Sequence, residues 1–368
     1  MGILAPASGG EPSSKPMLRL GTDMHFTMIN RISSDASGRV ILTCSDDKTA
    51  RLWDGKTGNL VRIFRVPVGT GHEGKLFACA LSPDGRLAAV GGWTDYQFSR
   101  KHAIYLFNTS TGEITQRLSG MGNVIFDIEF YSDRVFATAL GEKNGIRVFK
   151  KSGSQFTLYK KDTDYGGDSY NLAFDSRGQL ASVCSDGYIR LYDTDVNLIK
   201  KVKTTGGEVP FSLAFSLDNK KLAVGYSDTG TVEVLSADTL GLLYRPDNTG
   251  ADTRDQRIEI LTFGHGGYLY GGGAYSKSVE GNQWHFIRRW SDQGRGDFLD
   301  FKAAENTIMD IKPLGDGSII MAGAQPDLAR FTSVGDRMFY RTGEVPDFKN
   351  YQFRYLTVNR DASKKNFL

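Results

Sequence analysis

The stretch Arg31–Leu42, with the sequence RISSDASGRVIL, contains two short runs of alternating apolar residues joined by a tight polar turn. The same arrangement recurs at Cys79–Ala88, CALSPDGRLA. Period-two alternation on both sides of a turn rich in Gly, Asp and Ser predicts a pair of antiparallel strands. Further copies follow along the chain, and the turns lie at residues 38, 85, 133, 178, 219, 267 and 317.

Successive turns are 41 to 50 residues apart, a period at or slightly above that of a four-stranded propeller blade. After each hairpin a polar turn leads to a third apolar strand, at 50–54, 104–108, 146–149, 189–193 and 287–290. An outer strand follows, for example at 59–64. We find no helical periodicity longer than a turn. The sequence therefore predicts an all-β fold, a propeller of seven four-stranded blades.

The amino-acid composition and charge of the chain exclude several classes of protein. Of the 368 residues 43 are Gly, about 12% against a usual ~7%. The formal net charge is +3 with scattered charges, which gives no electrostatic support for nucleic-acid or membrane binding. Three cysteines without CxxC spacing lie in apolar runs, at positions 44, 79 and 184, and we expect reduced core thiols. With no signal peptide and no apolar run of ~18 residues, we expect a soluble cytoplasmic protein.

In the first repeat His25 precedes the inner strand, Ser45–Thr49 forms the second turn, and Trp53-Asp54 closes the third strand. These residues resemble the WD40-repeat family. The resemblance implies a buried hydrogen-bonded tetrad of His25, Thr43, Asp47 and Trp53, which stabilises only when every member is paired. Later repeats depart from this pattern: the second has Gly71-His72 but Phe107-Asn108 in place of Trp-Asp, and the fourth has Tyr165, Ser182, Asp186 and Tyr192. The resemblance covers roughly residues 17–345 and indicates the fold more strongly than the function.

The chain divides into three parts. We expect a flexible tail over residues 1–15, the propeller over 16–345 and an additional segment over 346–368. Met17–Leu20 is expected to supply an outer strand that latches the last blade, because closure removes an open sheet edge. Tyr355–Lys364 resembles the opening of a further, partial repeat. It either packs onto the seventh blade or begins the continuation of a longer chain, and we favour the continuation.

A second resemblance concerns mainly residues 24–150. The stretches 46–54, 71–76 and 89–94 are similar to propellers that precede a caspase-like peptidase domain in bacterial multidomain proteins. That resemblance implies a sensing or docking part of a larger bacterial effector protein, with the catalytic His and Cys outside this chain.

The sequence offers little catalytic chemistry. It contains no GxxxxGK[ST], GxSxG or HExxH motif, and its five histidines are scattered. Asp162, Asp164 and Asp168 bunch together, but their spacing departs from a calcium loop and favours a solvated turn. We therefore predict no catalytic residues, no metal and no cofactor. The alternative is a propeller enzyme, a metal-dependent lactonase or a quinoprotein-like oxidoreductase.

Two insertions lengthen the loop between the second and third strands, at 93–103 and 275–285. Because blades repeat in one orientation, both insertions are expected on the same face of the disc. Exposed aromatic and arginine side chains are typical of interface hot spots, although Trp93 and Trp284 could instead pack on their own blades. We predict a monomeric, non-catalytic scaffold that binds a protein or peptide partner through Trp93, Tyr96, Phe98, Arg100, Tyr275 and Trp284.

Overall fold

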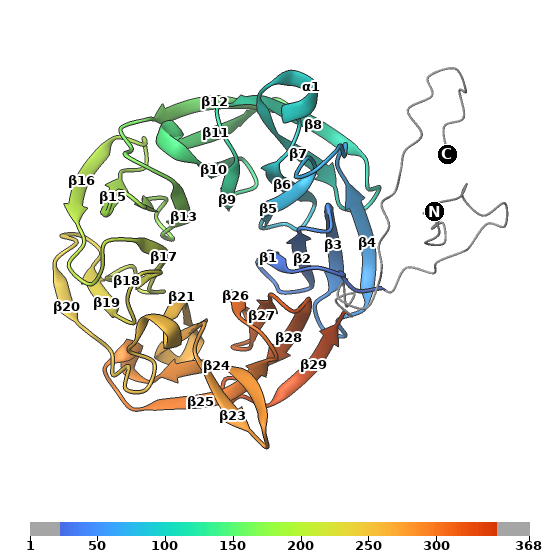
Figure 1. The fold of residues 1–368 in the computed structure, drawn as a ribbon. Helices are drawn as coiled ribbons and strands as arrows, with labels where there is room; N and C mark the ends of the chain where they lie inside the picture. Colours follow the sequence, from blue (N-terminus) through green and yellow to red (C-terminus); the bar gives the residue numbers. More distant parts are fainter. Residues whose placement is uncertain (1–22, 344–368) are drawn as a thin grey trace, which may run out of the picture.

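The computed structural model describes residues 23–343 (Figure 1). Over these residues the chain forms seven antiparallel sheets arranged around a common axis, and each sheet is built from consecutive strands. The predicted seven-bladed propeller is confirmed. The innermost strand of each blade lies next to the axis and the outermost strand lies at the perimeter (Figure 1).

The first four blades have regular four-stranded sheets. Blade 1 consists of β1 (Ile29–Ser34), β2 (Val40–Ser45), β3 (Thr49–Asp54) and β4 (Leu60–Arg65). Blade 2 consists of β5 (Lys75–Leu81), β6 (Leu87–Trp93), β7 (His102–Asn108) and β8 (Ile114–Met121). Blade 3 consists of β9 (Ile125–Ser132), β10 (Val135–Leu140), β11 (Ile146–Ser152) and β12 (Gln155–Asp162). Blade 4 consists of β13 (Ser169–Phe174), β14 (Leu180–Cys184), β15 (Tyr188–Tyr192) and β16 (Leu198–Lys203).

The last three blades include one irregular sheet. Blade 5 consists of β17 (Pro210–Phe215), β18 (Lys221–Tyr226), β19 (Val232–Ser236) and β20 (Leu242–Tyr244). Blade 6 consists of β21 (Ile258–Gly264), β22 (Tyr268–Gly273), β24 (Asn282–Trp290) and β25 (Phe298–Ala304), and a fifth short strand, β23 (Ser276–Val279), pairs with the start of β24. Blade 7 consists of β26 (Ile308–Pro313), β27 (Ile319–Gly323), β28 (Asp327–Phe331) and β29 (Arg337–Thr342).

Helical structure is sparse in the described part of the chain. One α-helix, α1 (Tyr96–Ser99), lies in the blade 2 insertion. Short 3₁₀ turns occur at η1 (Glu142–Asn144), η2 (Arg254–Gln256), η3 (His265–Gly267) and η4 (Asp292–Gly294). The predicted absence of longer helical segments agrees with this arrangement.

Each of the seven predicted turns lies between the first and second strand of a blade. Glycine or asparagine occupies the turn positions that adopt positive φ, as at Gly85 with φ 74° and Asn219 with φ 58°. A Cβ at Gly85 would also lie 3.2 Å from Cβ of Asp35 in the preceding blade. The turn residue thus serves both the backbone conformation and the close approach of neighbouring blades.

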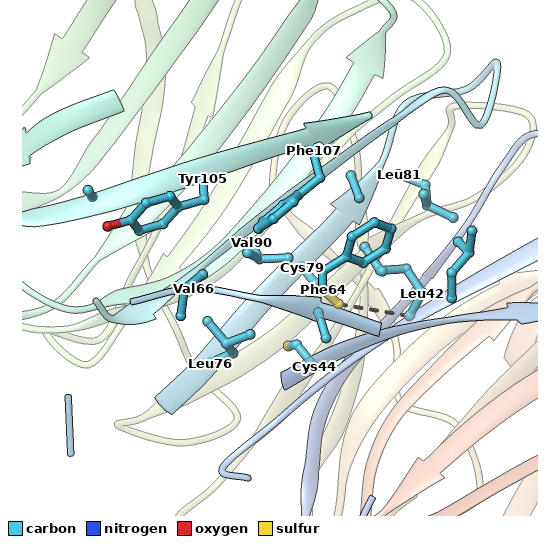
Figure 2. Close-up of a cluster of buried hydrophobic side chains, with 14 residues drawn as sticks. Leu42, Cys44, Phe64, Val66, Leu76, Cys79, Leu81, Val90, Tyr105 and Phe107 are labelled. Atoms are coloured by element: carbon cyan, nitrogen blue, oxygen red, sulfur yellow. Dashed lines mark hydrogen bonds between the residues drawn. The ribbon is translucent and has the colours of Figure 1, made fainter. Parts of the chain in front are cut away.

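The hydrophobic core lies between neighbouring blades rather than at the axis. Figure 2 shows the cluster between blades 1 and 2, where Leu42, Phe64, Val90 and Phe107 come together. The rings of Phe64 and Phe107 have centroids 5.1 Å apart. Cys79 is buried in this cluster, and burial raises the pKa of its thiol. All three cysteines are buried and free, as predicted.

The ring closes where blade 7 meets blade 1. The guanidinium group of Arg341 on β29 donates to the carbonyl oxygens of Gly58 at 3.0 Å and Thr57 at 3.1 Å. Near the axis, the backbone N–H of Ile32 donates to Asp310 at 3.0 Å. The outer strand of blade 7 is β29, whereas Met17–Leu20, predicted for that position, lies outside the described residues. The predicted segments 1–15 and 346–368 also lie outside them.

Candidate functional site

One face of the disc collects the connections between blades and the loops between second and third strands. We call it the loop face. The opposite face carries the turns between first and second strands and those between third and fourth strands. Both insertions belong to the loop face because each follows the second strand of its blade. The candidate site therefore consists of the buried residues that hold the loops of this face in place and the exposed residues on those loops.

The four residues of the implied tetrad come together in blade 1. The indole N–H of Trp53 donates to Thr43 Oγ1 at 2.8 Å, and Thr43 Oγ1 lies 2.7 Å from Nε2 of His25. His25 Nδ1 lies 2.8 Å from Asp47 Oδ2. Because the carboxylate can only accept, Nδ1 carries the proton and Nε2 accepts from the Thr43 hydroxyl. This order requires a neutral imidazole, and burial lowers the pKa of His25 despite the attraction of Asp47.

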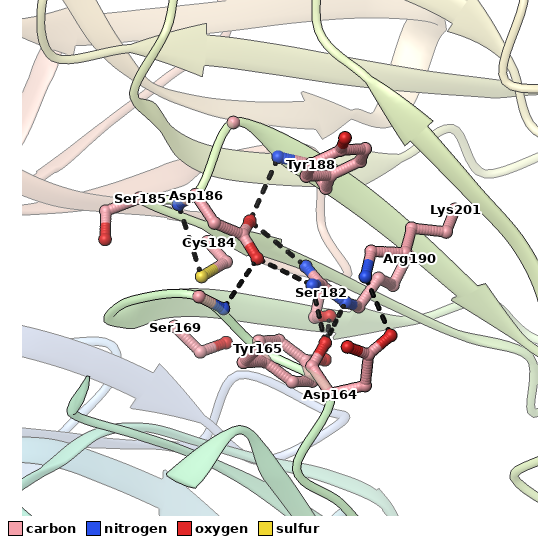
Figure 3. Close-up of polar contacts among 12 residues, drawn as sticks. Asp164, Tyr165, Ser169, Ser182, Cys184, Ser185, Asp186, Tyr188, Arg190 and Lys201 are labelled. Carbon is pink, nitrogen blue, oxygen red and sulfur yellow. Dashed lines mark hydrogen bonds and ion pairs between the residues drawn. The ribbon is translucent and has the colours of Figure 1, made fainter. Parts of the chain in front are cut away.

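Blade 4 contains a related network of different residues (Figure 3). The Tyr165 hydroxyl lies 2.6 Å from Ser182 Oγ and 2.8 Å from the hydroxyl of Tyr192. Asp186 does not join these hydroxyls but forms an ion pair with Arg190 at 2.6 Å. The guanidinium of Arg190 lies 3.9 Å from the centre of the Tyr165 ring. Both networks fix the connection that enters a blade, and so they hold the loop face in place.

The three aspartates near this network have separate partners. Asp162 accepts from the hydroxyl of Tyr192 at 2.8 Å, Asp164 pairs with Lys201 at 2.7 Å, and Asp168 accepts from the backbone N–H of Glu142 at 2.5 Å. Within residues 23–343, no three His, Cys, Asp or Glu side chains are grouped so that they could hold a metal ion.

The blade 2 insertion is anchored by buried carboxylates. Glu73, fully buried in the connection from blade 1, accepts from the backbone N–H groups of Asp95 and of Gln97, the second at 2.9 Å. Asp95 adopts a left-handed conformation with φ 72°, and its carboxylate accepts from Arg117 and from the hydroxyl of Tyr105. Aspartate tolerates this conformation, and the hydrogen bonds of Glu73 and Asp95 hold it in place. The insertion is consequently a fixed structure and not a loose loop.

Four rings pack beside this anchor. Trp93 makes an edge contact with His102, with centroids 5.3 Å apart, and contacts Tyr96 at 6.0 Å. Tyr96 stacks on His102 at 5.2 Å. His72, whose position suggested a tetrad residue, is exposed and instead lies 5.7 Å from Trp93. In blade 2 the histidine at the tetrad position therefore lies at the surface, where it packs against Trp93 of the insertion.

Three of the predicted binding residues remain exposed around this cluster. Phe98 is 59% exposed and Tyr96 is 38% exposed. Arg100 is also exposed, next to Lys101. Trp93 is half-buried beneath them. We call the exposed set, Tyr96, Phe98 and Arg100, the blade 2 platform.

The blade 6 insertion differs from the prediction. It forms a hairpin in which β23 pairs with β24, and Tyr275 is only 1% exposed. The hydroxyl of Tyr275 donates to Asp300 at 2.7 Å and accepts from Arg288 at 3.1 Å. The expectation that Tyr275 is an exposed binding residue is wrong, because its hydroxyl has a buried polar partner. Trp284 is half-buried, with Lys302 3.8 Å from its ring centre.

A ring of residues around the axis was missed by the sequence reasoning. Each innermost strand has a β-bulge near its start, and the residue inside the bulge is Asn30, Phe77, Phe126, Tyr170, Phe211, Glu259 or Met309 in blades 1 to 7. A bulge re-aims the side chain of its extra residue. Because the bulges lie at the starts of the inner strands, this ring belongs to the loop face. The sequence signal is the repeated aromatic second residue of the inner strand in blades 3 to 5.

Side chains just below the bulges link the blades. A side-chain oxygen on the inner strand of one blade accepts a hydrogen bond from a backbone N–H on the inner strand of the next blade. The pairs, with the acceptor first, are Ser33 and Leu81, Asp127 and Leu172, Asn171 and Leu213, Ser212 and Leu261, and Asp310 and Ile32. Arg31 reaches across from blade 1 and donates to the carbonyl oxygen of Tyr170 in blade 4 at 2.9 Å. Its guanidinium lies 3.8 Å from Asp127. These contacts fix the relative positions of the bulge residues.

These features define a seven-bladed propeller in which buried polar networks hold one loop-bearing face. Three segments match the WD40 family, described as WD domain, G-beta repeat, at residues 19–54, 63–95 and 165–193. They correspond to blades 1, 2 and 4, and two of these blades contain the networks described above. The described residues therefore form a seven-bladed β-propeller, and three segments of the chain are similar to WD40 repeats.

Two curated relatives are similar to parts of the chain. A Gallus gallus protein named p21-activated protein kinase-interacting protein 1-like is 28% identical over 189 residues, which is 50% of this chain and 46% of the relative. The Arabidopsis thaliana guanine nucleotide-binding protein subunit beta is 30% identical over 90 residues, 24% of this chain and 22% of the relative. The alignments thus span less than half the length of each relative. Among the described residues, no helix has the length and apolar character needed to cross a membrane.

Proposed function

We propose that the protein is a non-catalytic scaffold that binds a protein or peptide partner on its loop face. The observation that carries this proposal is the blade 2 platform. Its backbone is held by the buried carboxylates of Glu73 and Asp95, yet Phe98 and Tyr96 point large rings into solvent. Rigid exposed aromatic side chains lose little conformational entropy when a partner covers them, which favours binding.

Two further considerations support a scaffold over an enzyme. The buried carboxylates near the axis are already engaged, since Asp127 and Asp310 accept backbone N–H groups. A lactonase-like or quinoprotein-like site would need such groups for a metal or cofactor. The names of the two relatives describe an interacting protein and a subunit of an assembly. We propose that this chain also binds a protein partner.

The proposal includes the cellular location and the oligomeric state of the scaffold. We place it in the cytoplasm, where its three buried cysteines stay reduced, as a monomer without nucleic-acid or membrane ligands. We further propose that the first repeats correspond to the propeller of bacterial caspase-like peptidase fusions, which would give the scaffold a docking or sensing role beside an effector domain.

The test is capture of partners by the immobilised full chain. Tyr96→Ala combined with Phe98→Ala removes both exposed rings of the blade 2 platform and should reduce capture about tenfold or more, while the protein stays folded and loses only the stability that Tyr96 provides by stacking on His102. Leu217→Ala is the matched control, because Leu217 is 56% exposed in a turn of the opposite face. Equal capture by the double variant and the wild type would refute a partner site on this platform.

A further inference from the structure

Four consecutive bulge residues are aromatic and form a continuous arc, which we call the aromatic crescent: Phe77, Phe126, Tyr170 and Phe211. Ring centroids are 6.4 Å apart between Phe77 and Phe126, 5.6 Å between Phe126 and Tyr170, and 5.2 Å between Tyr170 and Phe211. Every member is half-buried. The crescent therefore presents partly exposed ring surface on the loop face, over blades 2 to 5.

The loops of blades 3 to 5 around the crescent are acidic. They cover residues 122–124, 141–145, 163–168, 185–187, 204–209 and 227–231, and contain six carboxylates but one cationic side chain, Lys143. Asp164 and Asp186 are paired with lysine and arginine side chains on strands. The remaining four form no ion pair with any described residue: Glu142, Asp168, Glu208 and Asp228.

One of these carboxylates is directly linked to the crescent. The hydroxyl of Tyr170 lies 3.4 Å from Asp168 Oδ2, and Asp168 Oδ1 accepts from the backbone N–H of Glu142. The carboxylate is thereby held beside the hydroxyl group of a half-buried tyrosine ring. An aromatic face and a carboxylate both attract a cation, the first through its quadrupole and the second through its charge.

We propose that the aromatic crescent binds a lysine or arginine side chain of an extended segment in the partner protein. This inference rests on the proposed scaffold function and specifies the chemistry of the partner. The cation would lie over the rings of Tyr170 and its neighbours, with Asp168 as counter-ion. A neutral apolar side chain would gain the ring contacts but would leave the four carboxylates without a counter-charge, so the charge complementarity selects the cation.

The experiment uses immobilised pools of nine-residue peptides with randomised flanks and one fixed central residue. The central residue is Arg, Lys, citrulline, norleucine or Glu, and the retained amount of the labelled full chain is measured. Citrulline and norleucine are neutral analogues of similar length to Arg and Lys. We expect the Arg and Lys pools to retain between about three- and thirtyfold more protein than the neutral pools, with a smaller ratio at high salt.

Two variants assign the preference to the crescent. Tyr170→Leu removes the central ring, and Asp168→Asn removes the charge while keeping the shape and the acceptor for Glu142 in case the first variant folds poorly. Each should lower the ratio of charged to neutral retention toward one, whereas Leu217→Ala on the opposite face should leave it unchanged. Equal retention of charged and neutral pools, absence of retention, or an unaltered ratio in Asp168→Asn would overturn the inference. Capture that depends on Phe98 would still support the scaffold, so the two proposals fail separately.

Discussion

Replacing Thr43 with valine should destabilise the propeller far more than the size of the change suggests. Valine has nearly the same shape and favours strands, so neither a cavity nor a backbone penalty is expected in β2. The substitution removes the one hydroxyl that both accepts from Trp53 at 2.8 Å and bonds His25 at 2.7 Å. Two buried polar groups, the indole N–H and Nε2 of the imidazole, then lose their hydrogen-bond partner.

The expected magnitude follows from this count of unpaired groups. Each buried group left without a partner costs about 1–3 kcal/mol, so Thr43→Val should lower the free energy of unfolding by about 2–6 kcal/mol. Trp53→Phe leaves Thr43 bonded to His25 and should cost only about 1–3 kcal/mol, from one lost hydrogen bond and reduced packing. Thr43→Ser keeps the hydroxyl and loses one methyl group, worth about 1 kcal/mol.

The assay is urea unfolding followed by far-ultraviolet circular dichroism and by tryptophan fluorescence. The two transitions must coincide for a free energy to be defined, because a repeat protein can unfold in parts. The expected order of stability is wild type, Thr43→Ser, then Thr43→Val, with partner capture retained at low denaturant. A Thr43→Val protein within 0.5 kcal/mol of the wild type, or more stable than Thr43→Ser, would show that the relay contributes little and would refute the reasoning.

Four further outcomes are expected. Arg31→Met removes the guanidinium that lies 3.8 Å from the buried Asp127 carboxylate, so it should destabilise by about 3–5 kcal/mol at pH 7; because burial raises the pKa of Asp127, the difference from wild type in urea unfolding should narrow as the pH falls. Tyr275→Phe should cost about 1–2 kcal/mol in the same assay and leave capture unchanged, the reverse of what an exposed contact residue would show. Phe98→Ala should shift the melting temperature by less than a degree but weaken capture, unlike Leu217→Ala. Burial lowers the pKa of His25 and His102 and of the half-buried His285, so the unfolded chain binds more protons near pH 6. Stability in thermal melts should therefore fall as pH drops below about 6.5, by up to about 1.4 kcal/mol per pH unit for each imidazole; a flat profile would contradict those pKa directions.

The strand order was predictable because its determinants are local. Alternating apolar residues specify which side chains enter the space between blades, and turn residues such as Gly38 and Gly85 permit the positive φ found in most of the turns after the first strands. The sequence pattern therefore located all seven hairpins. The tetrad residues could also be predicted, because their types and spacing in the first repeat resemble those of a known family.

The errors arose where orientation depends on distant partners. Tyr275 was expected to be exposed, but its hydroxyl is bonded to Asp300, which comes from the next strand after the hairpin. His72 was placed by its spacing beside a relay that blade 2 does not contain. The bulge ring escaped notice because a bulge changes the direction of one side chain without altering the hydrophobic alternation of the residues beyond it. Phe126 and Tyr170 consequently resemble core residues in the sequence.

The loop face combines two regions of opposite charge on one fixed frame. Arg100 and Lys101 extend from the insertion of blade 2, whereas the loops beside the aromatic crescent carry four carboxylates that form no ion pair with any described residue. The contacts that link the inner strands fix the distance between these two regions, so a bound partner must match their fixed spatial arrangement. A segment that covers both would need acidic residues over blade 2 and a basic residue over blades 3 to 5. Because a segment in the reverse orientation would place like charges together, this arrangement would select direction as well as composition.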